Sequence, residues 1–315
     1  MSVLAPAPPR LSRRLLRLGF VAVALGFGGW AVVTQWAGVR SAVANLGPWA
    51  VGGGLIAVIA GLVASMQVWR SLLAAAGSPL PFLAAARVFF IGQLGKYIPG
   101  SVWPIVAQME LASAYRVPRR RAATTAVLTM LISLCAGLIC AVVALPLLAS
   151  GTLSGYRWAL LAAPVILACL HPRVVNPVVD RLLRLARRTP LEQPLTGRAV
   201  AVALGWAVLS WLLLGCHVWI LTVALDAPPA RAFALAVGGF AFAWSVGFLA
   251  VVAPAGAGVR DLLLVTALSG TMSTGSATAI ALTSRVLMTA GDLVLAGLAA
   301  LRRRAATAAP PAEDS

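Results

Sequence analysis

The 315-residue sequence has little charge: 10% of its residues are charged, whereas a soluble domain has about 25%. Hydrophobic residues make up 61% of it. Several windows near twenty residues long carry no charge, among them Leu18–Val39 and Ala199–Leu225. Each window is long enough to cross a bilayer core of about 30 Å. The composition therefore excludes an ordinary soluble domain and predicts an all-α polytopic membrane protein.

Acidic residues and lysine are scarce. Eight Asp and Glu stand against 25 Lys and Arg, the net charge is +17, and Lys96 is the single lysine. In a soluble protein this balance would suggest nucleic acid. Here the basic residues flank the apolar windows, as the positive-inside rule and anionic headgroups require, so no nucleic-acid partner is predicted. The dominance of arginine is typical of a GC-rich bacterial genome and favours a bacterial plasma (inner) membrane.

Several motifs are missing. The sequence has no G-x-x-x-x-G-K-[ST] phosphate loop, no dinucleotide fingerprint, and no CxxC or Cys/His metal spacing. Its four cysteines lie inside apolar windows, where they read as small core residues. We therefore predict no cofactor, no metal site and no direct pumping driven by ATP.

Two short breaks interrupt the apolar pattern, at residues 96–101 (Lys-Tyr-Ile-Pro-Gly-Ser) and 254–261 (Pro-Ala-Gly-Ala-Gly-Val-Arg-Asp). They lie at corresponding places of two halves that share one order: two long segments, a broken pair and a long segment. Broken segments at matching positions point to a transporter binding site. The predicted long spans are Leu18–Val39, Trp49–Trp69, Ala122–Leu148, Leu153–Leu170, Ala199–Leu225 and Ser276–Leu301; the predicted broken pairs are Phe82–Tyr97 with Val102–Tyr115 and Ala232–Val252 with Val259–Leu268.

Arginine placement favours an inverted repeat. If each broken pair is a re-entrant hairpin, each half crosses three times and the second half is inverted. With both termini cytoplasmic, 19 basic residues then lie inside and only Arg40, Arg157 and Arg231 lie outside. We expect about six transmembrane helices plus two re-entrant hairpins. The expected regions are a basic cytoplasmic N-terminus at 1–17, a first membrane repeat at 18–149, a second at 150–301 and a cytoplasmic tail at 302–315.

The loop between the halves contains an expected amphipathic helix at 177–188. Asn176 suits the cap and Pro177 the first helical position. Such a helix either lies in the interface or serves as an ordinary cytoplasmic connector. The glycine runs 52–54 and 238–239 predict close contacts between helices.

Ionisable groups at membrane depth are candidate functional residues. Around the breaks, cations and free backbone N–H groups at helix N-termini would suit a phosphate. The predicted substrate-binding residues are Lys96, Gly100, Ser101, Glu110, Gly256, Gly258, Arg260, Asp261 and Arg285. No catalytic residue is assigned.

Alternatives remain for the charges. Glu110 either pairs with Lys96 or is protonated in a dry environment. The second-half charges either serve a site or neutralise one another, and Arg285 and Asp292, seven residues apart, share a helix face. Adjacent side chains diverge, so Asp261 is expected to pair beyond Arg260, with Arg285 as one candidate.

At the breaks the chain resembles the transmembrane region of the lysylphosphatidylglycerol synthase family, described as flippase-like. The resemblance rests on residues 92–101, 116–122, 254–261 and 284–287. In bifunctional members this region is thought to flip an aminoacylated lipid that a separate cytosolic domain makes. The resemblance implies a stand-alone flippase-like protein, and we expect no synthase activity. Many relatives have Glu where this chain has Asp261.

Three functions follow from these expectations. The leading one is a lipid flippase or transporter-like protein that binds an anionic headgroup, of a phospholipid or a polyprenyl-phosphate lipid, between two re-entrant hairpins. The alternatives are a membrane-embedded transferase and a non-catalytic partner of envelope-biosynthesis proteins. An inverted repeat is expected for the first and unnecessary for the others.

Overall fold

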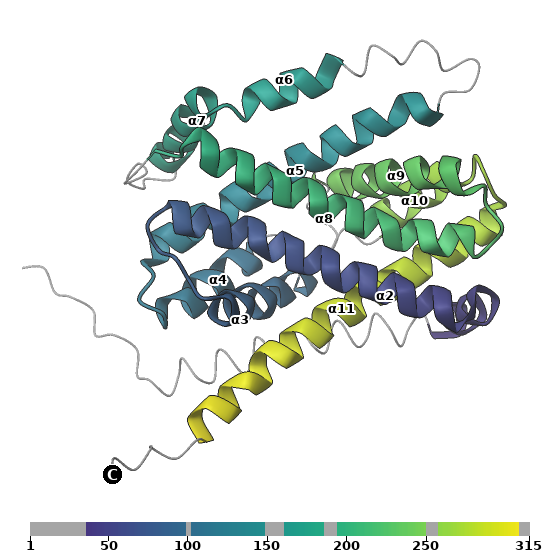
Figure 1. Ribbon diagram of the computed structural model, residues 1–315, viewed down its shortest axis with the longest axis horizontal. Coiled ribbons are helices and arrows are strands. Elements are labelled where there is room, and N and C mark those ends of the chain that lie inside the picture. The colour runs from purple at the N-terminus through teal and green to yellow at the C-terminus, as the bar shows by residue number, and fades with distance from the viewer. Residues whose placement is uncertain (1–35, 99–101, 149–160, 186–193, 250–257, 309–315) are drawn as a thin grey trace, which may run out of the picture.

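The computed structural model (Figure 1) describes residues 36–98, 102–148, 161–185, 194–249 and 258–308. Within these ranges every regular element is a helix, which confirms the all-α prediction. The helices are α2 Trp36–Ala75, α3 Phe82–Gln93, the short 3-10 helix η1 Leu94–Tyr97, α4 Trp103–Ser113, α5 Arg119–Leu148, α6 Ala162–Cys169, α7 Pro172–Leu185, α8 Gly197–Val223, α9 Pro229–Leu249, α10 Val259–Leu268 and α11 Thr274–Ala308.

Five of the described helices are long and apolar enough to cross a membrane. The protein is thus a multi-pass membrane protein. The spans are Leu46–Ala75 in α2, Arg119–Ala144 in α5, Gly197–Val223 in α8, Pro229–Phe248 in α9 and Thr274–Leu301 in α11.

The predicted spans and the observed helices differ most at two places. The helix α9 was expected as a re-entrant half, but its apolar stretch is long enough to cross alone. Of the span predicted at 153–170, the structure describes the eight-residue helix α6. Most of the span predicted at 18–39 lies outside the described residues. The count of six spans and the inverted repeat stay predictions.

The helix α11 packs against elements from both halves. In Figure 1, α2 and α8 lie side by side and α5 runs beside α8 and α9, while α11 crosses α2. The same helix also contacts α3, η1 and α10. Fully buried Trp69, Phe89 and Phe240 fill the core between these layers. The described parts of both predicted breaks therefore lie next to one helix.

Three helices end in the same way. Gly77, Arg116 and Asp226 have positive φ angles of 82°, 60° and 62°. The residue after each donates its N–H to a carbonyl five residues back, as Ser78 does to Leu73 at 3.0 Å. This is the Schellman arrangement, and the proline that follows prevents the helix from continuing. It sets the sharp turns after α2, α4 and α8.

Glycines bring helices into close contact, as predicted. A Cβ atom on Gly238 of α9 would lie 2.3 Å from the Ala144 Cβ of α5. One on Gly54 of α2 would lie 2.9 Å from Leu287 Cδ1 of α11. Small residues let helix backbones approach in this way within a membrane.

The amphipathic helix begins earlier than predicted. It starts at Pro172, and Pro177 lies inside it. The expected cap at Asn176 is wrong, because the Asn176 amide instead exchanges two hydrogen bonds with the Leu195 backbone, at 3.0 and 3.1 Å. Pro172 suits the first helical position just as Pro177 does, which explains the shift. Residues 186–188 lie outside the described residues.

Candidate functional site

The first break is fastened to α11 through Asp292. The Nζ atom of Lys96, at the end of η1, lies 2.5 Å from Asp292 Oδ2. The neighbouring Tyr97 hydroxyl donates to the same oxygen at 2.7 Å. Asp292 is 3% exposed and Lys96 is 26% exposed. The buried Asp292 carboxylate thus pairs with one cation and accepts a hydrogen bond from one hydroxyl. Both groups come from a single turn of the first break.

The second break is fastened to α11 through Asp261, in the first turn of α10. Its Oδ2 atom lies 3.0 Å from Arg285 Nη1 and accepts a 3.3 Å hydrogen bond from the Gly258 N–H. Gly258 has a φ angle of +87°, which favours glycine. Asp261 thus occupies the helix N-terminus that the sequence assigned to a bound anion, and it satisfies that end of α10 internally.

Arg260 is a buried cation with weak pairing. Its side chain is 9% exposed, and its Nε atom lies 3.8 Å from Asp261 Oδ1, beyond hydrogen-bond length. Its guanidinium carbon lies 5.9 Å from the centre of the Phe240 ring on α9. A Cβ atom on Gly247 would lie 3.1 Å from Arg260 Cβ, so only a small residue fits there. Among the described residues, no carboxylate oxygen lies within hydrogen-bond distance of Arg260.

One face of α11 joins both breaks. Arg285 and Asp292 are two helical turns apart, about 10 Å along the axis. The sequence left open a direct pair between these two residues. In the structure, Arg285 instead pairs with Asp261, and Asp292 pairs with Lys96. We call these five residues the ion-pair cluster: Lys96, Arg260, Asp261, Arg285 and Asp292. Three cations face two carboxylates, which leaves one positive charge.

Glu110 lies apart from this cluster. Its Oε2 atom pairs with Arg119 Nη2 at 2.7 Å, where α4 gives way to α5. The pair with Lys96, one of the two alternatives for Glu110, is therefore wrong, because Lys96 pairs with Asp292. Of the other predicted site residues, Gly100, Ser101 and Gly256 lie outside the described residues.

His217 is a buried structural neighbour of the cluster. Its Nε2 atom lies 2.8 Å from Ser284 Oγ, next to Arg285, and its Nδ1 atom contacts the Leu214 carbonyl. Its ring meets Phe240 edge-on, with centroids 4.9 Å apart. His217 is thus a hydrogen-bonded residue that links α8 to the same face of α11.

Sequence reasoning missed Tyr97, Phe240 and the role of Asp292 as the anchor of the first break. Tyr97 follows Lys96 directly, and Asp292 was recognised as an acid at membrane depth. Those two signals were available. Phe240 is one of many aromatic residues in apolar helices, and nothing in the sequence distinguishes it.

Residues 15–296 match the model of the lysylphosphatidylglycerol synthase TM region. The chain belongs to this family. Comparison with curated proteins returns no match. Since the match covers nearly the whole chain, this membership supports a function related to membrane lipids and includes both breaks and the ion-pair cluster.

Proposed function

We propose that this protein moves an anionic, phosphate-bearing lipid between the leaflets of a bacterial plasma membrane and performs no chemical step on it. The observation that carries the proposal is the attachment of both broken segments to one face of α11 by ion pairs. Charges at membrane depth are costly and are kept where they serve a substrate path. Family membership supports a lipid as that substrate.

The charge of the cluster supports an exchange of its ion-pair partners with a phosphate. Its excess positive charge attracts an anion, and Arg260 lacks a close carboxylate among the described residues. Guanidinium groups bind phosphate through paired N–H donors, so Arg260 and Arg285 would hold the headgroup with Lys96 beside them. The phosphate would displace either Asp261 or Asp292, and the displaced carboxylate would then bind a cationic part of the headgroup or a proton.

This exchange gives a route to alternating access. Lys96 and Tyr97 attach η1 to α11, while Asp261 attaches α10 to the same helix. Displacing one carboxylate releases one break from α11 and leaves the other attached. A headgroup would then reach the cluster from one leaflet at a time. Glu110, paired with Arg119, lies apart from the cluster and would take no part in this exchange.

The packing supports the predicted inverted repeat. The helices α5 and α11 occupy equivalent positions: α5 contacts α4, α8 and α9, and α11 contacts α10, α2 and α3. The turns after α2 and α8 also match, each with a positive φ followed two residues later by proline. In Figure 1 the α3–α4 pair lies toward one end of the long helices and α9–α10 toward the other. With both termini cytoplasmic, this arrangement keeps most arginines inside.

A leaflet-exchange assay tests the proposal. Purified protein would be reconstituted into liposomes that carry a fluorescent phosphatidylglycerol, a fluorescent polyprenyl phosphate or a fluorescent phosphatidylcholine. Dithionite destroys the outer-leaflet fluorophore, so exchange appears as bleaching beyond one half of the signal. We expect exchange of an anionic probe, its loss in Arg260→Gln, and its retention in the control Arg231→Gln, which changes an exposed arginine. Equal bleaching by Arg260→Gln and the unchanged protein would refute the proposal.

A further inference from the structure

We propose that a pocket between α6, α7 and α8 is a second lipid site, which binds an anionic phospholipid with one acyl chain inside and its phosphate at His171 and Arg173. The pocket shares no residue with the ion-pair cluster. The inference is therefore independent of whether the cluster moves a lipid.

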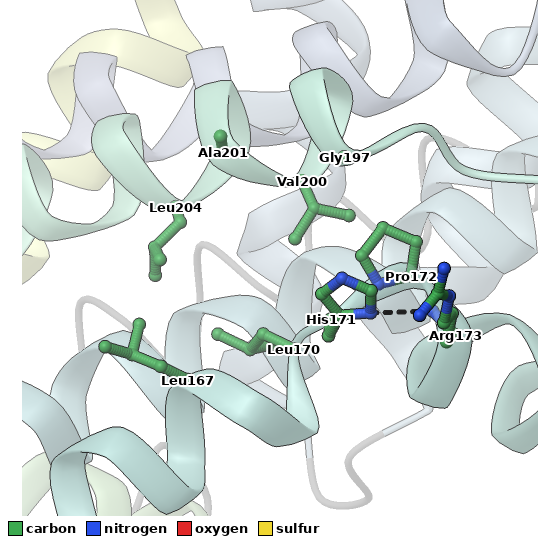
Figure 2. Close-up of a pocket in the computed structure, with 9 residues that line it drawn as sticks. All are labelled: Leu167, Leu170, His171, Pro172, Arg173, Gly197, Val200, Ala201 and Leu204. Carbon is green, nitrogen blue, oxygen red and sulfur yellow. Dashed lines mark hydrogen bonds between the residues drawn. The ribbon is translucent and has the colours of Figure 1, made fainter.

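The pocket has the size and lining of a site for one chain. Its volume is about 480 Å³, within the range of about 300–1,000 Å³ found for small-molecule sites. Figure 2 shows apolar side chains at one end, where Leu167 of α6 lies across from Leu204 of α8. The lining residues are Leu167, Leu170, His171, Pro172, Arg173, Gly197, Val200, Ala201 and Leu204.

The helix α6 leaves this apolar wall uncovered. None of the residues of α6 is buried, and Val165 and Leu167 are 61% and 46% exposed. An apolar cavity does not hold water well, because water finds no polar partners there. In a bilayer the hydrocarbon available to fill it is an acyl chain.

The other end of the pocket is polar and basic. Figure 2 places His171 and Arg173 together there, where the Arg173 backbone N–H donates to His171 Nδ1 at 3.3 Å. Both side chains are exposed. The described parts of α6, α7 and α8 carry four arginines and a single acid: Arg173, Arg181, Arg184, Arg198 and Asp180. Such an excess of arginine at a membrane surface selects anionic headgroups over zwitterionic ones.

The polar end is held in place before any lipid binds. The two hydrogen bonds between the Asn176 amide and the Leu195 backbone fix α7 beside the start of α8. Thr196 caps α8 by accepting a 3.2 Å hydrogen bond from the Ala199 N–H. The backbone that carries Arg173 is therefore held next to the apolar wall before binding, which lowers the cost of ordering the site.

Native mass spectrometry of the full chain tests the proposal. The purified protein would be titrated with phosphatidylglycerol and with phosphatidylcholine of the same acyl chains. We expect tighter binding of phosphatidylglycerol, weakened on the order of tenfold by Arg173→Ala with His171→Ala, since hydrogen bonds to charged groups are strong. Arg231→Ala with Trp49→Ala, a pair of exposed residues elsewhere, is the control and should bind as the unchanged protein does.

A second pair of variants tests the apolar part. Leu204→Trp would fill the pocket opposite Leu167 and should lower binding of both lipids. Leu209→Trp places the same ring on an exposed position of α8 and should leave binding unchanged. Equal affinity for the two lipids would overturn the proposal. So would loss of phosphatidylglycerol binding in Lys96→Ala with retention in the Arg173 variant, because that pattern would assign the lipid to the cluster.

Discussion

At the scale of the residue, the side chain of Asp292 on α11 is 3% exposed and contacts Lys96 and Tyr97. A charge so placed is stabilised by its partners, and removing one partner leaves the other uncompensated. Replacing both partners by apolar groups of similar volume is often neutral, because no charge is then buried. Comparing the single and the double replacement therefore separates the contribution of the pair to stability from its contribution to binding.

We predict that Lys96→Met lowers the free energy of unfolding and that adding Asp292→Leu restores it. Since Lys96 is 26% exposed, the expected loss is near the lower end for buried pairs, about 3 kcal/mol. Thermal unfolding in detergent measures both changes. An additive loss in the double variant would show that the two side chains are not coupled.

The charged residues of the cluster could be picked out from the sequence, and the pair of Asp261 with Arg285 was among the candidates, but the other pairs could not be predicted. Lys96, Arg260, Asp261 and Arg285 were predicted as site residues, and all four lie around α11. Helical spacing says that Arg285 and Asp292 share a face, yet it does not say which element packs on that face. For that reason the pairs of Lys96 with Asp292 and of Glu110 with Arg119 required the fold.

At the scale of the element, hydropathy located the helices better than it placed them across the membrane. The bounds of α10 agree with the sequence prediction, and α4 differs from its prediction by one or two residues at each end. Pro and Gly mark such ends directly. The same residues do not reveal that α9 is long enough to cross alone, because both a re-entrant half and a span are apolar.

Close contact between α5 and α9 gives an element-scale prediction. Gly238→Val should lower stability by about 1–3 kcal/mol, because the added methyl groups meet Ala144 and overpack the contact. Gly205→Val on α8, where nothing lies within 4 Å of a built Cβ, is the matched control. Thermal unfolding compares the two. Equal losses would attribute the effect to helix propensity and not to packing.

At the scale of the whole molecule, the inverted repeat predicts on which side each loop lies. Arg120 should face the cytoplasm and Ala230 the outside, and both are exposed. We predict that an impermeant maleimide labels Ala230→Cys in intact spheroplasts, and labels Arg120→Cys only after permeabilisation. The background would have its four native cysteines replaced. Labelling of both positions from one side would contradict the inverted topology.

The account is tested most directly by leaflet exchange of fluorescent phosphatidylglycerol and polyprenyl phosphate in the Lys96→Met/Asp292→Leu protein. This variant should be folded, because no buried charge is left unpaired at that position. The account predicts that it fails to exchange the probe that the unchanged protein exchanges, since the phosphate has lost the cation supplied by the first break. A folded double variant that exchanges the probe at the unchanged rate would contradict it.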